Sequence, residues 1–305
     1  MRELVIDGQR IADDTDCYVI AEIGHNHGGS VETCKALFDA AKDAGCHAVK
    51  LQKRDNRTLY APEMFDAPYN SENAFGPTYG THREALEFDR EQYELLKCYA
   101  ESIGLTFFAT AFDVPSLLFL ARLDVPAIKI ASGDLTNTEL LKEAAKIGKP
   151  IILSTGGGTI GDVLHANELL RDVPRAIFQC TSGYPASYDE LNLSVIETYR
   201  AMFHNTVVGW SAHDTGTTMA LCAYALGARI IEKHFTLDRA WKGTDQAMSL
   251  EPKGMAYMIE NLRLAKRSMG DGIKRRYDSE NQPLLKQEKN ERGQIDGQPK
   301  LRAVA

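Results

Sequence analysis

The chain has 305 residues, of which 44% are hydrophobic and 25% charged, and its formal net charge is −7 at pH 7. These are the values of a globular protein, and the negative charge argues against a nucleic-acid binder, which needs a basic face. No apolar run approaches the roughly 20 residues that span a bilayer, and the N-terminal MRELVIDGQR lacks the apolar core of a signal peptide. We therefore expect a cytoplasmic protein without membrane contact. The six scattered cysteines form no CxxC pair, which also indicates a reducing compartment.

Short β-rich runs alternate with amphipathic runs along most of the chain. ELVIDGQRI at 3–11 predicts a small hairpin around its Asp-Gly pair. Helical patterns such as VETCKALFDAAKDAG and NTELLKEAAKIGKP separate the apolar runs, and residues 251–270 predict a last helix. Eight strand–helix units favour a (β/α)₈ barrel of the TIM type. A doubly wound sheet is the alternative, although no GxGxxG follows the first strand. The apolar runs lie near residues 17–23, 47–52, 105–111, 127–132, 150–155, 176–181, 207–212 and 230–236.

Two segments depart from the repeat. Residues 53–89 are polar, aromatic and loop-like, and a connection of that length inside a compact domain is usually a lid or a binding loop. The polar C-terminal tail, 277–305, is rich in Gln, Lys, Glu, Asn and Gly and reads as a linker or a disordered end. We therefore expect one barrel domain over residues 1–276, followed by this tail.

Polar residues recur where the predicted strands end, and in a barrel these ends form one active-site mouth. Two lysines within apolar strands are costly to bury unless a site pairs or solvates them. For one lysine a salt-bridged structural residue is the better interpretation, but two lysines with several strand-end hydroxyls favour a site for phosphate or carboxylate. The strand-end residues are Glu22, Lys50, Gln52, Thr110, Lys129, Ser132, Asp134, Ser154, Cys180, Ser182, Ser211, His213, Glu232 and His234.

Histidines occur in two places where a metal could bind. A single strand-end histidine is more often a structural residue than a metal ligand. His213 and His234 end consecutive strands, so a divalent-metal site is at least as good an interpretation as two structural residues. The HNH of AEIGHNHGGS begins as a metal-dependent amidohydrolase does. That class also needs histidines after strands five and six, where LSTG and QCTS stand instead. We therefore expect His25 to be a loop residue, and Asn26 and His27 to line the mouth without binding metal.

The ordered set of strand-end motifs resembles the sialic acid synthase (N-acetylneuraminate synthase) family, which condenses phosphoenolpyruvate with an N-acylated amino sugar. The matching stretches, from about residue 17 to 270, are AEIGHNHGG, AVKLQK, IKIASGD, PIILSTG, QCTSGYP, VGWSAHDTG, EKHFTLD and KGTDQAMSLEP. The insert PYNSENAFGPTYGTHREALEF resembles the animal-type branch, some of whose members act on phosphorylated as well as free N-acetylmannosamine.

The resemblance implies a role for each site residue. Phosphoenolpyruvate would bind Lys50, Thr110, Lys129, Ser132, Ser154 and Ser211. His213 and His234 would hold manganese or magnesium, Glu22 and Asp134 would handle water and protons, and Gln52, Ser182, Tyr184 and Asp245 would face the sugar. Several members have glutamate in place of Asp134 and asparagine in place of Ser182. A homodimer is also implied.

Members of this family usually carry a small C-terminal antifreeze-like domain that places an arginine on the sugar's acyl group. The tail is too short and too polar for such a domain. We expect a separate protein to supply it, or a different sugar. The third explanation, substitution by Arg292 or Arg302, requires a disordered tail to be ordered at an entropic cost.

Two other functions remain open. A lysine Schiff-base aldolase would use Lys129 as its nucleophile. A barrel that has lost catalysis would serve only as a sugar-binding subunit, although both lysines and both strand-end histidines remain. The sequence leaves open which sugar is used and whether it is phosphorylated.

Overall fold

The computed structural model describes residues 2–298. Two compact units make up the chain, one up to residue 266 and one from residue 267 on. Within the described residues no helix combines the length and the apolar character that a bilayer-spanning segment requires.

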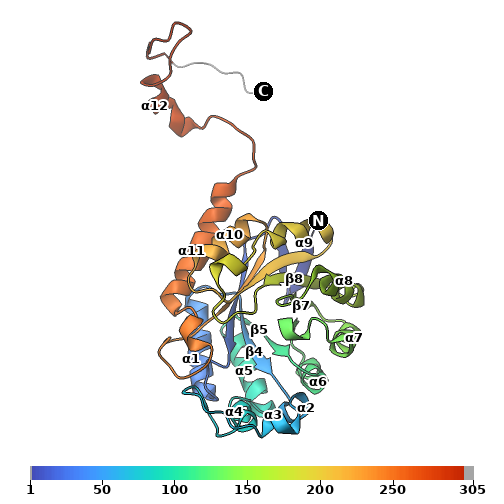
Figure 1. The fold of residues 1–305 in the computed structure, drawn as a ribbon. Coiled ribbons are helices and arrows are strands. Elements are labelled where there is room, and N and C mark those ends of the chain that lie inside the picture. The colour runs from blue at the N-terminus through green and yellow to red at the C-terminus, as the bar shows by residue number, and fades with distance from the viewer. Residues whose placement is uncertain (1, 299–305) are drawn as a thin grey trace. The chain divides into compact units, whose positions relative to one another are not determined.

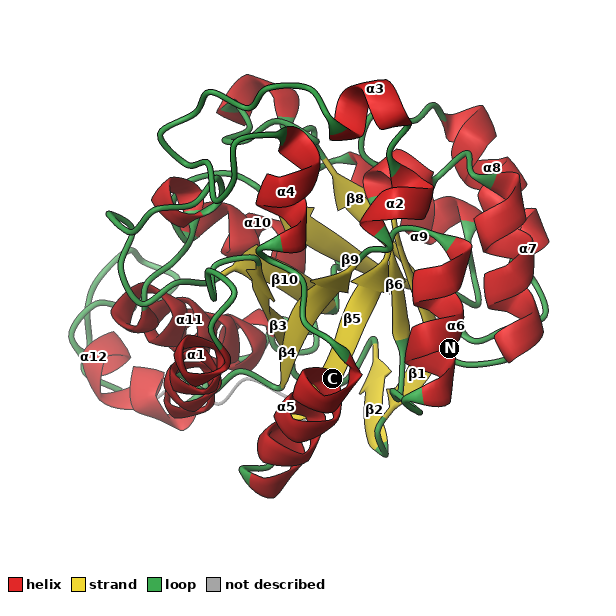
Figure 2. Ribbon diagram, turned by 90° about the horizontal axis from the view of Figure 1, so that it is seen from below, coloured by secondary structure: helices red, strands yellow, loops and turns green. Residues whose placement is uncertain are grey.

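Eight parallel strands close into a barrel, with the helices outside it (Figures 1 and 2). The ring closes between the last and the first barrel strand, where Ile230 pairs with Tyr18. This closure confirms the predicted (β/α)₈ barrel and excludes the doubly wound sheet. The barrel strands are β3 Tyr18–Gly24, β4 Ala48–Lys53, β5 Thr106–Ala111, β6 Ile128–Ile130, β7 Ile151–Ser154, β8 Arg175–Cys180, β9 Val207–Ala212 and β10 Ile230–His234.

The outer helices form where the sequence combines a cap with a helical apolar period. In α1, the Ser30 side chain caps the first turn by accepting from the Thr33 amide, and the residues spaced along one face, including Leu37 and Phe38, are buried. In α7, Gly148 ends the helix with a left-handed φ of 76°. The outer helices are α1 Val31–Asp43, α5 Arg90–Ser102, α6 Val114–Arg122, α7 Thr138–Ile147, α8 Ile160–Leu169, α9 Val195–Met202, α10 Thr218–Ala225 and α11 Pro252–Met269.

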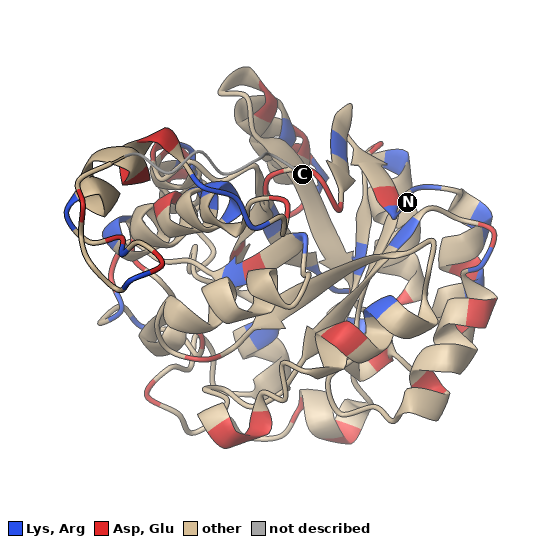
Figure 3. Cartoon of the chain, turned by 90° about the horizontal axis from the view of Figure 1, so that it is seen from above, with Lys and Arg blue, Asp and Glu red and all other residues tan. Residues whose placement is uncertain are grey.

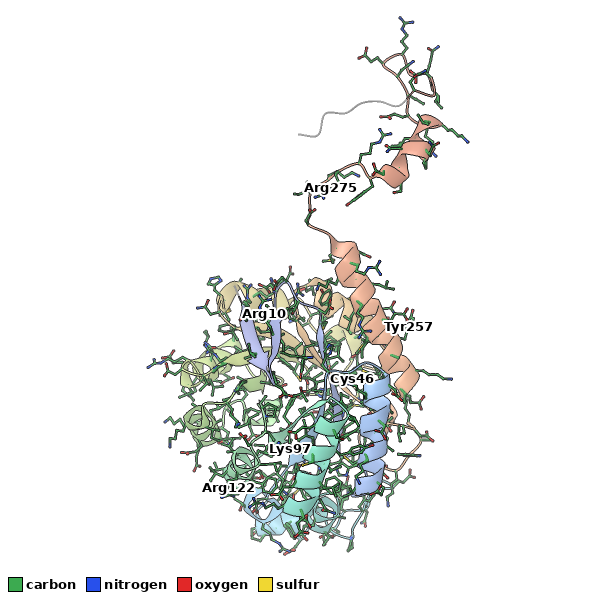
Figure 4. All side chains as sticks on the ribbon, turned by 180° about the vertical axis from the view of Figure 1, so that it is seen from behind. Arg10, Cys46, Lys97, Arg122, Tyr257 and Arg275 are labelled. Atoms are coloured by element: carbon green, nitrogen blue, oxygen red, sulfur yellow. The ribbon has the colours of Figure 1, made fainter. Side chains whose placement is uncertain are left out.

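Acidic and basic residues are interspersed on the outer helices (Figure 3). On α5, Lys97 pairs with Glu101 one turn later, with 2.7 Å between Nζ and Oε1. Figure 4 shows Lys97 on this helix and Tyr257 on α11, whose opposite face buries Met255 and Ile259. The helices therefore bury one apolar stripe each and leave a solvated, mixed-charge surface.

The predicted N-terminal hairpin is present as β1 Glu3–Ile6 and β2 Gln9–Ala12. Its turn residues, Asp7 and Gly8, both have positive φ, 51° and 73°. This is the backbone that a two-residue hairpin needs, and the Asp-Gly pair tolerates it.

The connection between β4 and α5 is more ordered than the loop-like sequence indicated. It contains three short helices, α2 Asn56–Leu59, α3 Pro62–Phe65 and α4 Tyr79–Glu84. Thr78 and Thr81 cap α4 reciprocally, and the ring centroids of Tyr69 and His82 are 4.7 Å apart. The connection also contacts the segment after β10, because the Gly243 amide donates to Asn73 Oδ1 over 3.0 Å.

Short 3-10 helices lie in the connections after β6, β8 and β10. They are η1 Ser132–Asp134, η2 Tyr188–Glu190 and η3 Gln246–Met248. The described part of the second unit contains η4 Asp278–Glu280 and α12 Asn281–Leu285. Within this unit Arg276 and Glu288 form an ion pair, with 3.2 Å between Nη1 and Oε2. Of the two tail arginines, Arg292 belongs to this unit, while Arg302 lies outside the described residues.

Candidate active site

A cavity of about 640 Å³ opens among the C-terminal ends of the barrel strands. The parallel register explains the convergence: across neighbouring strands Glu22 pairs with Lys50 and with His234, and Thr110 pairs with Lys129. Residues at equal depth on parallel strands end at the same mouth.

Lys50 lies at the floor of this cavity and is fully enclosed by polar partners. Its Nζ is 2.6 Å from Glu22 Oε2 and 2.7 Å from Thr110 Oγ1. Burial, followed by the negative charge of Glu232, raises the pKa of Glu22 even though Lys50 opposes the shift. The Gln52 amide donates to the other oxygen of Glu22 over 2.6 Å. Glu22 can therefore hold a proton within hydrogen-bonding reach of the cavity.

Lys129 completes the floor from the neighbouring strands. Its Nζ donates to Ser154 Oγ over 2.7 Å and lies 3.7 Å from Glu232 Oε1. The same Glu232 oxygen accepts from Ser211 Oγ over 3.2 Å and lies 3.8 Å from Lys50 Nζ. Glu232 thus links both lysines, while its Oε2 has no hydrogen-bond partner in the described chain. Burial lowers the pKa of Lys129, against the raising effect of Glu232.

His213 and His234 face the same cavity, with ring centroids 5.4 Å apart. His213 Nδ1 donates to the Thr181 carbonyl over 2.8 Å, which leaves Nε2 with a lone pair. His234 Nδ1 is buried without a hydrogen-bond partner among the described residues and lies 3.8 Å from Asp245 Oδ2. Burial lowers the pKa of His234 to about 4, so the ring is neutral near pH 7.

Neutral imidazoles are ligands that fit a divalent cation. Burial keeps His234 neutral, whereas the pKa of His213 is raised because the hydrogen bond and charge of the Cys180 thiol outweigh its burial. Within residues 2–298, no cluster of three or more His, Cys, Asp or Glu side chains is arranged as a complete metal site. The two histidines would therefore be the chain's principal ligands, and the remaining positions would be left for water and substrate.

The residues of the HNH stretch lie differently from what the sequence predicted. His25 lies between two arginines, with Nε2 3.1 Å from Arg54 Nη1 and Nδ1 3.3 Å from Arg83 Nη1. Asn26 does not line the cavity: its Nδ2 donates to the Phe235 carbonyl. His27 does not line it either, because its ring stacks on Phe88 at 4.2 Å and is buried. The expectation that Asn26 and His27 line the mouth is wrong. Asn26 is bound to the backbone after β10 and His27 packs on Phe88, so both side chains hold the loop in place outside the cavity.

The structure brings nearly all the predicted site residues together. The exception is Asp134, which does not line the cavity although Ser132 of the same 3-10 helix η1 does. Its Oδ1 accepts from Asn137 Nδ2 over 3.0 Å, so its position does not support the expected role in handling water. The predicted residues that line the cavity are Glu22, Lys50, Gln52, Thr110, Lys129, Ser132, Ser154, Ser182, Tyr184, Ser211, His213, His234 and Asp245.

Sequence reasoning missed other lining residues. Arg54 and Phe112 each follow a predicted strand, and the Arg54 guanidinium lies 3.6 Å from the centre of the Phe112 ring. A scan of the residues just after each strand could have found both. Arg83 and Thr244 lie away from the strand ends, inside the insert PYNSENAFGPTYGTHREALEF and the stretch KGTDQAMSLEP that the resemblance had already singled out. Glu232 was recognised as a strand-end residue, but its shared contact with both lysines was not expected.

The fold and the site together define this class of protein: a (β/α)₈ barrel with a charged, polar cavity at its strand ends. Comparison with known proteins identifies the family within this class. The NeuB family profile matches residues 37–274. The N-acetylneuraminate-9-phosphate synthase of Drosophila melanogaster is 42% identical over 81% of this chain and 68% of its own length. The N,N'-diacetyllegionaminic acid synthase of Legionella pneumophila is 36% identical over 87% of this chain and 76% of its own.

Among solved structures, the N-acetylneuraminic acid synthetase of Leptospira borgpetersenii serovar Hardjo-bovis, in complex with citrate, superposes with a TM-score of 0.79. The two chains are 32% identical, and the match covers 93% of this chain and 95% of the other. This chain belongs to the NeuB family.

Proposed function

We propose that this chain condenses phosphoenolpyruvate with the aldehyde of an N-acylated amino sugar, giving a nonulosonic acid and phosphate. The observation that carries the proposal is the floor of the cavity, where Lys50 and Lys129 lie among hydroxyls and share Glu232. Membership of a family whose named relatives are N-acetylneuraminate-9-phosphate, legionaminic and pseudaminic acid synthases supports it.

The floor suits the binding of a small molecule with both a phosphate and a carboxylate. The lysine ammonium groups supply positive charge in a buried setting, where electrostatic contacts are strongest. Thr110 and Ser154 already accept hydrogen bonds from these lysines over 2.7 Å, so their hydroxyl protons are free to donate to an anion. Ser132 and Ser211 add two further hydroxyls to the lining.

The reaction forms one carbon–carbon bond and breaks one bond to phosphate. The enol carbon of phosphoenolpyruvate adds to the aldehyde carbon, water adds to the neighbouring carbon, and phosphate leaves as the ketone forms. Glu22, whose pKa burial raises, is placed to give a proton to the aldehyde oxygen or to take one from the water. The lysines stabilise the charge on the departing phosphate.

His213 and His234 would hold a divalent cation, manganese or magnesium, at the aldehyde end of the cavity. When bound, such an ion polarises a carbonyl oxygen. The chain's own contribution is to orient both imidazoles and to keep His234 neutral. The Thr181 carbonyl fixes the tautomer of His213, and the Tyr184 ring packs 4.2 Å from the His213 ring. We also propose, from the family resemblance, that the enzyme works as a homodimer.

A phosphate-release assay with phosphoenolpyruvate and a panel of N-acyl sugar aldehydes tests the function. We expect phosphate release that depends on both substrates, together with formation of a 2-keto acid of the combined carbon count. Phosphate release without any sugar, or no release with any member of the panel, would contradict the proposal.

The lowered pKa of Lys129 favours one second candidate, an aldolase that forms an imine through this lysine. A buried lysine with a depressed pKa is the nucleophile such chemistry needs. Its position argues for the synthase instead, because its Nζ is engaged by Ser154 and lies near Glu232. Reductive trapping with pyruvate separates the two candidates, since only the aldolase forms an imine.

A further inference from the structure

A buried ion pair lies between the two strands that carry the candidate metal ligands, on the outer side of the barrel wall. Lys233 Nζ is 2.6 Å from Asp214 Oδ1, and each side chain is 1% exposed. Lys233 directly precedes His234 at the end of β10, and Asp214 directly follows His213 after β9. Successive side chains point to opposite faces of a strand. Both histidines accordingly line the cavity, and neither Lys233 nor Asp214 does.

Lys233 binds the backbone of Asp214 as well as its side chain. The same ammonium group that pairs with the carboxylate also donates to the Asp214 carbonyl oxygen. From the other side, the Ala186 amide, in the connection after β8, donates to the His213 carbonyl over 3.0 Å. The two peptides that follow His213 are therefore held from both neighbouring strands, and the contact from β10 comes from the residue next to the second histidine.

The neighbours of Lys233 leave room for this contact. In the parallel register Lys233 lies opposite Ala21 on β3 and opposite Ala212 on β9, and both alanines are buried. A small side chain on each neighbouring strand lets the four-carbon stem cross the sheet towards the segment after β9. The ammonium group also lies 5.8 Å from the centre of the Trp210 ring, a favourable distance for a cation over an aromatic face.

Stability alone does not account for a lysine at this position. Desolvating both charges of a buried ion pair offsets most of their attraction, so apolar side chains of similar volume would stabilise the fold at least as well. An ammonium group differs from an apolar group in carrying three donors, and here they bind both a carboxylate and a backbone carbonyl. Groups that orient metal ligands in this way strongly affect metal affinity without touching the ion.

We propose that Lys233 is a positioning residue for the metal site. By binding the carboxylate and the backbone of Asp214, it holds the His213 and His234 imidazoles at the separation at which both can bind one divalent cation. The inference rests on the proposed function, in which these two histidines hold such an ion. Lys233 itself touches neither the ion nor a substrate, because its side chain lies outside the cavity.

Calorimetric titration of metal-stripped protein with Mn²⁺ tests the role of Lys233. Lys233→Met removes the ammonium group and should weaken Mn²⁺ binding by about 10-fold or more, the usual effect of losing a group that orients a metal ligand. The double variant Lys233→Met with Asp214→Leu removes both charges, so urea unfolding should show that it regains most of the stability. Its Mn²⁺ binding should stay weak, because the backbone contact is still missing. This variant also serves if Lys233→Met alone does not fold.

Lys53→Met is the matched control. Lys53 also ends a barrel strand, and its ammonium group likewise binds a carboxylate and a backbone carbonyl, those of Glu87 and Phe88, over 2.9 and 3.0 Å. Neither of these partners adjoins a candidate metal ligand in the sequence. Lys53→Met should therefore lose stability and keep the Mn²⁺ affinity of the wild type.

Three outcomes would overturn the proposal: unchanged Mn²⁺ affinity in Lys233→Met, a double variant that recovers affinity together with stability, or an equal loss of affinity in Lys53→Met. Mn²⁺ binding is measured without turnover, so a specific loss in Lys233→Met supports the proposal even if no sugar is condensed, in which case only the condensation fails. A wild type that does not bind Mn²⁺ refutes the metal site and the role of Lys233 with it, while phosphate release still decides the condensation.

Discussion

Lys50 and Glu22 face each other in register across β3 and β4, with 2.6 Å between Nζ and Oε2, and both side chains are 2% exposed. A buried ion pair of this kind adds little net stability, because desolvating both charges offsets their attraction. Removing one partner is costly, since the other charge stays buried alone. The pair therefore fits the proposed role in binding phosphoenolpyruvate better than a role in stabilising the fold.

Lys50→Met should therefore lower the free energy of unfolding by about 3–5 kcal/mol and weaken phosphoenolpyruvate binding by roughly 2–5 kcal/mol. The double variant Lys50→Met with Glu22→Gln removes both charges, so it should regain most of the stability without regaining affinity. Urea unfolding and calorimetry measure the two quantities. A double variant that recovers binding would show that Lys50 is only structural.

Lys129→Met should likewise weaken phosphoenolpyruvate binding, by about 2 kcal/mol or more, because it removes one of the two floor cations. Borohydride reduction of the wild type in the presence of pyruvate should leave its mass unchanged, since the proposed reaction passes through no imine. A reduced adduct on Lys129, found by peptide mass analysis, would favour the aldolase instead.

His213→Ala and His234→Ala should each abolish tight binding of Mn²⁺, measured by titration calorimetry on metal-stripped protein. The reason is that each removes one of the two imidazoles facing the cavity. Chelator treatment should abolish turnover of the wild type, and manganese should restore it. His165→Ala, at an exposed position of α8, is the control and should bind Mn²⁺ as the wild type does. Unchanged binding in both cavity variants would rule out the assignment.

We expect the burial of His27 to lower the free energy of unfolding in acid. Burial lowers its pKa to about 3 from 6.5, so between these values the unfolded chain binds a proton that the folded chain does not. Stability from this residue is therefore fully present above pH 6.5 and falls by about 1.4 kcal/mol per pH unit as the pH drops towards 3.

His27→Gln should remove this component and make the dependence of unfolding free energy on pH less steep between 6.5 and 4.5, even if the variant is less stable at pH 7.5. The slope from the other histidines with lowered pKa, such as His25 and His234, should remain. His165→Gln, at an exposed position, should leave the slope unchanged. Parallel slopes for wild type and His27→Gln in urea unfolding would contradict the assignment of a neutral buried ring.

The sequence by itself determined the barrel and most of its floor. Apolar runs of strand length and capped amphipathic helices are local signals, and parallel strands bring their ends together wherever the chain closes. Lys50, Thr110, Lys129, His213 and His234 could be grouped on that basis alone.

Tertiary structure alone decided the contacts that depend on loop paths. Arg83 reaches His25 across 58 positions of sequence, because the connection after β4 folds into short helices that approach the HNHGG loop. Asp134 does not line the cavity, although Ser132 of the same η1 does, and its carboxylate accepts from Asn137 instead. Glu232 joins both lysines because the closed barrel turns their side chains towards one centre. Periodicity specifies which residues lie at a strand end, but the direction of a side chain beyond that end is set by packing between segments distant in sequence.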